Sequence, residues 1–174
     1  EVSIGRIDID LFSRVRVEDF YVEDHEQDTL LYVRRASAMI KSLNIPEDGL
    51  LLGWAEAEGG LFNLRELQSG ELNIHPIVRS LQRRDAKSNF RMVIDHIDAS
   101  DLEFRYERLQ HRNPEYGVDY YDMQITDIGG EIRNFMVMQN RVECDVVAIT
   151  AHERSGFEAS RISTHLLVDI GEVR

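Results

Sequence analysis

The 174-residue sequence has few residues that interrupt or crosslink a chain, with three prolines and one cysteine. The single cysteine, Cys144, excludes an internal disulfide, and its place on the apolar parity of its strand predicts a buried structural thiol. No run approaches the roughly 18–20 apolar residues that a membrane-spanning helix needs, and no signal peptide is visible. The chain opens inside a strand pattern without an initiator Met, so we expect residues 1–174 to be one β-rich segment excised from a larger protein.

Positive charge is also in short supply. The 20 basic residues are outnumbered by 32 acidic ones, which gives a net charge of −12. Such an excess repels phosphate backbones, so we expect no nucleic-acid partner. It also disfavours electrostatic docking on anionic lipid headgroups. Contact with lipid tails is unaffected by this argument because that contact is apolar.

The abundant feature is a two-residue alternation of apolar and polar side chains. Ser160–Ile170, Arg141–Ala148 and Asp101–Glu107 show it best, with apolar residues on one parity and mostly polar residues on the other. Successive side chains of a strand point to opposite faces, so the pattern predicts a sheet with one apolar and one wet face. We therefore look for function first on that surface.

Roughly ten strands and one short helix are predicted, which makes the chain all-β with mostly antiparallel neighbours. Parity slips at Gly5–Arg6, and again between Val17 and Phe20, predict bulges or bends. A helix is expected from Pro76 to about Arg84, followed by a loose connection over Gln82–Asn89. The expected extended segments are Val2–Leu11, Val15–Val22, Thr29–Leu43, Leu50–Ala57, Leu61–Leu67, Leu72–Ile74, Phe90–Ile97, Ser100–Glu107, Val118–Thr126, Glu131–Gln139, Arg141–Ala151 and Phe157–Ile170.

Catalytic and metal-binding constellations are hard to find. None of the six histidines has the i, i+4 spacing of a helical zinc site. His96 and Asp98 share a strand face, which allows a metal or acid–base role, although a wet strand face is favoured. The pairs Gly59–Gly60 and Gly129–Gly130 are interpreted as hinge or hairpin glycines between strands. We therefore expect no enzyme activity, no cofactor and no metal.

Several segments together resemble the N-terminal part of AsmA/TamB-like proteins, particularly the large forms of the Bacteroidetes type. They are Ile4–Asp24, Asp28–Val33, Gly60–Leu64 and Glu153–Glu158. In that family a strand is followed by a turn containing glycine and then by strands ending near a Gly-x-Phe-Asn-Leu segment. Here Glu26–Asp28 replaces the usual glycine of the turn.

This resemblance implies an elongated sheet, curled like a taco, with an apolar inner groove. It implies a periplasmic protein of the bacterial cell envelope, anchored in the inner membrane by a helix outside this sequence. Its function would be lipid transport between the inner and outer membranes, or outer-membrane biogenesis. The implied partners are lipid acyl chains and outer-membrane assembly proteins, and the family has no catalytic residues to carry over.

The candidate positions for the groove are apolar residues that share a parity on their strands, and the sequence does not divide groove from core. Self-pairing of the fragment is also expected, through edge strands that excision from the larger protein exposes. The alternative hypothesis is a structural or protein-interaction β module with a closed core and partner strands bound at its edges. The candidates are Ile94, Leu102, Phe104, Tyr106, Val142, Val146, Ile162, Leu166 and Val168.

Overall fold

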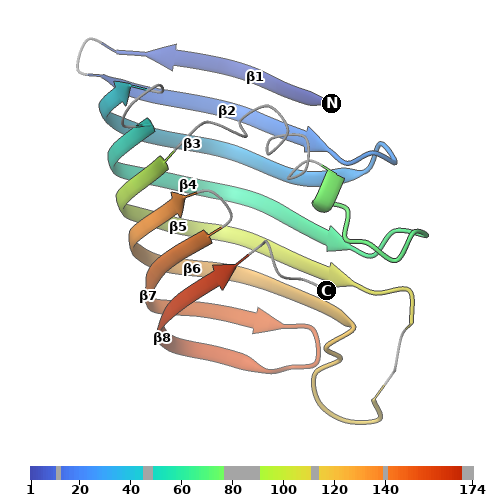
Figure 1. Cartoon of the computed structure of the whole chain (residues 1–174). Helices are drawn as coiled ribbons and strands as arrows, with labels where there is room; N and C mark the ends of the chain where they lie inside the picture. The colour runs from blue at the N-terminus through green and yellow to red at the C-terminus, as the bar shows by residue number, and fades with distance from the viewer. Residues whose placement is uncertain (11–12, 45–48, 77–90, 111–113, 139–140, 170–174) are drawn as a thin grey trace.

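The computed structural model describes residues 1–10, 13–44, 49–76, 91–110, 114–138 and 141–169. All of its named strands belong to one eight-stranded sheet whose spatial order follows the sequence (Figure 1). The strands are β1 (Val2–Ile9), β2 (Arg14–Glu23), β3 (Thr29–Asn44), β4 (Gly49–Arg65), β5 (Arg91–Glu107), β6 (Asp122–Met138), β7 (Arg141–Glu153) and β8 (Glu158–Asp169).

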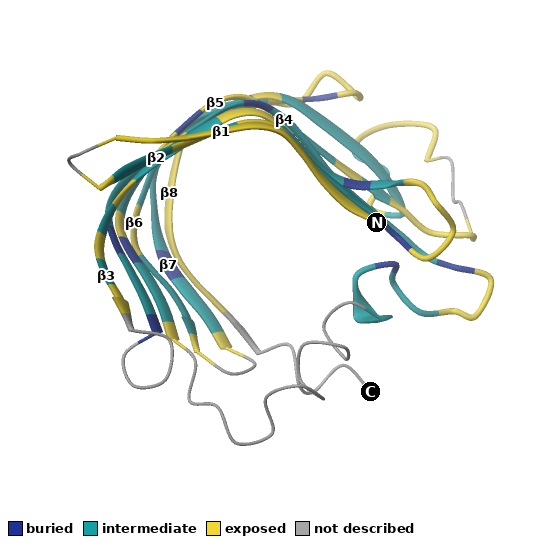
Figure 2. Ribbon diagram, turned by 90° about the horizontal axis from the view of Figure 1, so that it is seen from above, coloured by how far each residue is buried: buried dark blue, intermediate teal, exposed yellow. Residues whose placement is uncertain are grey.

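The sheet is curled and open. Neighbouring strands are antiparallel except β4 and β5, which run parallel. Seen along the stack of strands, each long strand bends into an arch, and the arches lie one behind another (Figure 2). The first and last strands, β1 and β8, do not pair with each other, so the sheet is not closed. The predicted all-β, elongated and curled sheet is confirmed.

Several strands are longer than predicted. Leu50–Ala57 and Leu61–Leu67 were expected as separate segments, but β4 runs through both as far as Arg65. The glycine pair between them is therefore not a hairpin. Gly59 instead takes a left-handed φ of 63° inside the strand, and so the chain bends there without leaving the sheet.

The same correction applies to the next two strands. The segments expected on either side of Ala99 are a single β5, and those expected on either side of Gly129–Gly130 are a single β6. Gly130 has a φ of 146° and pairs with Ala99 of the neighbouring strand. The predicted hinge is thus a bend within a strand, whereas the predicted hairpin is wrong.

The bends form a line across the sheet, which we call the kink line. It consists of residues with left-handed φ between 52° and 63°, which lie at matching register positions from β2 to β5 and are offset by two or three residues in β6 and β7. Aspartate tolerates this conformation better than most residues because its short side chain bonds locally. Apolar residues on one face of a strand are normally two residues apart in the sequence. Across the kink line they are three residues apart, as Ile4 and Ile7 of β1 are. The kink line contains Asp19, Gly59, Asp101, Asp127 and Ala148.

The predicted helix is described only at its start. His75 and Pro76 are helical, whereas the remainder of Pro76–Arg84 and the connection Gln82–Asn89 lie outside the described residues. The short strand expected over Leu72–Ile74 is reduced to a single bridge between Glu66 and Leu72. Over the described ranges, no helix has the length and hydrophobicity needed to cross a bilayer.

Candidate functional site: the apolar face of the sheet

One face of the sheet carries rows of apolar side chains that cross the strands. Directly paired residues lie on the same face, so the register defines each row. The longest row runs from β1 to β7 and ends at Thr164 in β8. A second row, one step closer to the kink line, holds smaller residues. The first row is Ile9, Val15, Ala38, Ala55, Ile97, Ile132 and Val146, and the second is Ile7, Val17, Ala36, Ala57 and Ala99.

Bulkier residues flank these central rows on the same face. Beyond the kink line, Phe62 pairs with Phe104, and their ring centroids are 6.0 Å apart. On the other side, Leu52 pairs with Ile94, which pairs with Phe135. Asn134, immediately before Phe135, has a φ of 53° and forms a second bend in the strand. Because of this bend, Phe135 lies on the apolar side of the sheet. We call the central and flanking rows together the apolar face.

All nine sequence candidates occupy register positions of this apolar face. Leu102, Phe104 and Tyr106 follow one another on β5 beyond the kink line. Val142 and Val146 alternate with the buried Cys144 on β7. The β8 positions pair with β7, and Val168 is placed by its backbone pairing alone. The remaining pairings are Ile94 with Phe135, Ile162 with Ile149, Leu166 with Cys144, and Val168 with Val142.

Burial is concentrated on this face although no second sheet covers it within the described ranges. Leu52, Ile94, Ala99 and Cys144 are each 9% exposed or less. At the β8 edge the same face is open, since the candidates Ile162 and Leu166 are 45% and 39% exposed. Burial raises the pKa of the Cys144 thiol, which agrees with its predicted role as a structural thiol.

The opposite face is charged, and its rows alternate with the apolar ones. Arg35 lies 2.6 Å from Glu58 across β3 and β4, and Arg6 lies 2.8 Å from Asp8 on β1. These pairs are exposed, so each contributes little stability. Their main effect is to give one side of the sheet a wet surface. The charged rows are Asp8, Arg16, Ser37, Glu56, Asp98 and Glu131, and Arg6, Glu18, Arg35 and Glu58.

The predicted proximity of His96 and Asp98 occurs on this charged face. His96 Nε2 lies 3.0 Å from Asp98 Oδ1, and His96 Nδ1 lies 2.9 Å from Glu131 Oε1. Trp54 donates its indole N–H to Asp98 at 2.8 Å. This hydrogen bond, with that from His96, lowers the pKa of Asp98. Within the described ranges, no group of three or more His, Cys, Asp or Glu residues is arranged to hold a metal ion.

Two hollows among the described residues are shallow and polar. One, of about 340 Å³, lies over charged residues of β2, β3 and β4, including Arg16, Arg35 and Glu56. The other, of about 490 Å³, lies at the kink line beside Arg34 and Asp101. Neither lining contains a histidine or the cysteine.

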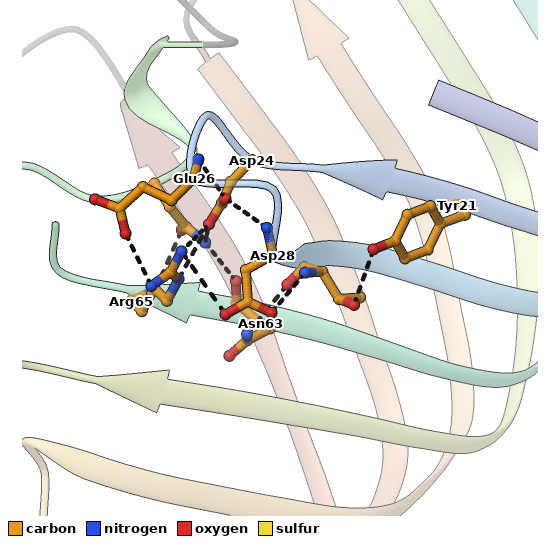
Figure 3. Close-up of polar contacts among 8 residues, drawn as sticks. Tyr21, Asp24, Glu26, Asp28, Asn63 and Arg65 are labelled. Carbon is orange, nitrogen blue, oxygen red and sulfur yellow. Dashed lines mark hydrogen bonds and ion pairs between the residues drawn. The ribbon is translucent and has the colours of Figure 1, made fainter. Parts of the chain in front are cut away.

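A buried polar cluster fixes one rim of the sheet (Figure 3). The side chain of Asp24, in the turn after β2, is fully buried and accepts two hydrogen bonds from Arg65, at 2.8 and 3.0 Å. It also accepts backbone N–H bonds from Glu26 and Asp28 and an amide bond from Asn73. Burial alone raises the pKa of Asp24, but these donors outweigh it and lower that pKa. The cluster ties three segments together and is structural.

The nine candidates from the sequence include no residue of the first four strands or of β6, which also contribute to the apolar face. The candidates came from β5, β7 and β8, where alternation is long and visible. Phe20, Phe62 and Ile132 show less regular alternation because kinks interrupt their strands. The available signal was the parity slip itself, since the slips noted at Gly5–Arg6 and before Phe20 both fall on the kink line.

No protein-family model matches this chain, and no curated protein matches it significantly.

Proposed function

We propose that the apolar face shelters the acyl chains of lipids and that the chain is a non-enzymatic β-groove segment. The observation that carries this proposal is the long row from Ile9 to Val146, which presents an apolar residue on each of seven consecutive strands. The row crosses the strands, and so a groove along it would be continuous. An acyl chain needs continuous apolar contact more than any single specific contact.

We infer that the apolar face is the inner side of the arch. Side chains converge on the inner side of a bent sheet and shield one another from water. Leu52, Ile94 and Ala99 are buried in a single-layered sheet, as this convergence requires. Charged pairs such as Arg35–Glu58 on the outer side keep the segment soluble.

The dimensions and energies suit this role. Eight strands spaced by about 4.8 Å give a groove roughly 34 Å long, whereas one leaflet's hydrocarbon is about half of the roughly 30 Å bilayer core. A lipid's tails therefore fit within the groove. Each methylene removed from water contributes about 0.8 kcal/mol, and the net charge of −12 does not oppose contact with tails.

The wider setting proposed is the one implied by the AsmA/TamB-like resemblance. The segment belongs to a periplasmic protein anchored in the inner membrane and serves lipid transport or outer-membrane biogenesis. An open, curled sheet with one apolar face supports this reading, because a conduit for tails needs an open apolar side and a wet exterior.

The test compares two neighbouring lysine substitutions in β3 that add the same charge to opposite faces. Ala38→Lys places an ammonium in the central apolar row, whereas Ser37→Lys places it in a charged row. Lipids co-purifying with each variant are extracted and quantified by mass spectrometry, and circular dichroism checks that both variants fold. We expect wild type and Ser37→Lys to retain phospholipid and Ala38→Lys to lose most of it.

The result that contradicts the proposal is absence of lipid from all three proteins after expression in a cell with abundant phospholipid. Equal lipid content in the two folded variants also contradicts it, since binding then does not use the apolar face. A protein-interaction module, the alternative hypothesis, predicts the first of these outcomes.

A further inference from the structure

The first strand lies at one edge of the described sheet. β1 pairs with β2 on one side, and no strand lies on its other side within the described sheet. Its four apolar side chains are exposed by between 47% and 70%. Natural edge strands are commonly blunted by proline, inward-pointing charge or a covering segment. The apolar side chains that reach this free edge are Val2, Ile4, Ile7 and Ile9.

The backbone of the same residues faces outward. The amide of Glu23 donates to the carbonyl of Glu1, and the amide of Asp10 donates to the carbonyl of Arg14. In an antiparallel pair, residues alternate between facing the partner strand and facing away. The backbone groups of Glu1 and Asp10 face β2. Alternation from each end of β1 toward its middle therefore leaves the backbone groups of the four apolar residues facing away from β2.

The order of these residues is self-complementary. The parity slip at Gly5 falls in the middle of β1, so the strand reads apolar–polar–apolar toward the slip from either end. Two copies of β1 laid antiparallel place Val2 opposite Ile9 of the second copy and Ile4 opposite Ile7 of the second copy. Each pair then joins two outward-facing residues, which can exchange both backbone hydrogen bonds.

Antiparallel pairing also keeps the faces aligned. A two-fold axis perpendicular to the sheet leaves both apolar faces on the same side, whereas parallel pairing of the same edge turns one sheet over. On the charged face, Asp8 opposes Ser3 and Arg6 opposes Gly5 of the second copy, so no like charges lie directly opposite.

We propose that this chain forms a two-fold dimer through antiparallel β1–β1 pairing, in the register Val2 to Ile9 and Ile4 to Ile7. The dimer joins two eight-stranded sheets into one continuous sheet. The interface is isologous, so it closes after two copies. This proposal concerns assembly and does not depend on lipid binding.

The experiment measures the mass of the 174-residue chain by light scattering and sedimentation over a range of concentrations. We expect twice 20.2 kDa at high concentration, falling to the monomer mass on dilution. Ile4→Pro removes one outward N–H and is tolerated at a strand edge, so it should give monomer at every concentration. Ile7→Lys acts on an exposed side chain and gives the same expectation if the proline variant fails to fold. Ile162→Lys, at the opposite edge, should leave the dimer unchanged.

Oxidative crosslinking tests the register. Cysteine at position 6 lies diagonally across the axis from its own copy, within roughly the 4.4–6.8 Å range that a disulfide spans. Cysteine at position 3 lies five residues from its copy, or roughly 17 Å. We expect Arg6→Cys to crosslink and Ser3→Cys and wild type, whose Cys144 is buried, to remain uncrosslinked.

Three outcomes overturn the proposal. Monomer at all concentrations shows that β1 does not self-pair. Loss of the dimer in Ile162→Lys shows that association uses β8. A ladder of higher oligomers shows head-to-tail pairing of β1 with β8, because a heterologous contact does not close after two copies.

Discussion

The kink line depends on a close approach of Arg34 to Gly59, and replacing that glycine tests it. Gly59 has a φ of 63°, and a Cβ added there would lie 2.5 Å from Arg34 Nε. Arg34 is held by Glu58 at 3.1 Å and Asp101 at 3.2 Å. Alanine at this position must adopt a left-handed backbone and also displace the guanidinium from both carboxylates.

The magnitude follows from these two costs. The left-handed conformation costs alanine about 1–2 kcal/mol, and losing two exposed ion pairs adds about 1 kcal/mol. Gly70 is the matched control because it has a φ of 82° with no atom within 4 Å of an added Cβ. Gly70→Ala should therefore cost only the backbone part, about 1–2 kcal/mol.

Urea denaturation followed by circular dichroism measures both variants, and a double-mutant cycle separates the contact. In an Arg34→Ala background, the cost of Gly59→Ala should fall by about 1 kcal/mol, to that of Gly70→Ala. Equal costs for the two glycines in the wild-type background, with a coupling of zero, would refute the packing of Arg34 over the bend. A neutral Gly59→Ala would refute the left-handed kink itself.

Three further predictions concern the rim, the charged face and the β4–β5 seam. Asp24→Asn should cost about 3 kcal/mol at neutral pH because it breaks a buried ion pair. Since folding lowers the pKa of Asp24, this difference in the free energy of unfolding should start to shrink as the pH falls below about 4, the ordinary Asp value, and should disappear only below the lowered pKa of folded Asp24. Free energies of unfolding measured from pH 7 downward check this. Trp54→Phe removes the indole donor, so the pKa of Asp98 should rise toward its ordinary value, as read from carboxyl chemical shifts in an NMR titration. Gly49→Ala places a Cβ 1.8 Å from a main-chain oxygen of β5, so its thermal unfolding midpoint should fall further than that of any other glycine variant described above.

Local alternation of apolar and polar residues predicted the fold class because the pattern within each strand shows which of its faces is exposed to water. On β7, the alternation that places Val142, Cys144 and Val146 on one face can be recognised without knowing which strands pair with β7. What local patterns do not encode is pairing between distant strands. The parallel pairing of β4 with β5 joins residues separated by the long segment 66–90, and no turn signal specifies it.

The kinks account for most of the remaining errors. A glycine pair such as Gly59–Gly60 is equally typical of a hairpin and of a bend inside a strand, and only the register of β3 and β5 on either side distinguishes them. Asp24 and Arg65 are likewise separated by 41 residues. Their buried pairing depends on where β2 and β4 end, so neither residue stood out in the sequence.

The most direct test of the central proposal is photo-crosslinking to phospholipid from neighbouring positions on opposite faces. A benzophenone amino acid is placed at Ala57 or Ile97 on the apolar face, and at Glu56 or Asp98 on the charged face, in cells making the full chain. We expect lipid adducts, identified by mass spectrometry, from the first pair of positions and background levels from the second. Adducts of equal yield from both faces, or from the charged face alone, would contradict the account.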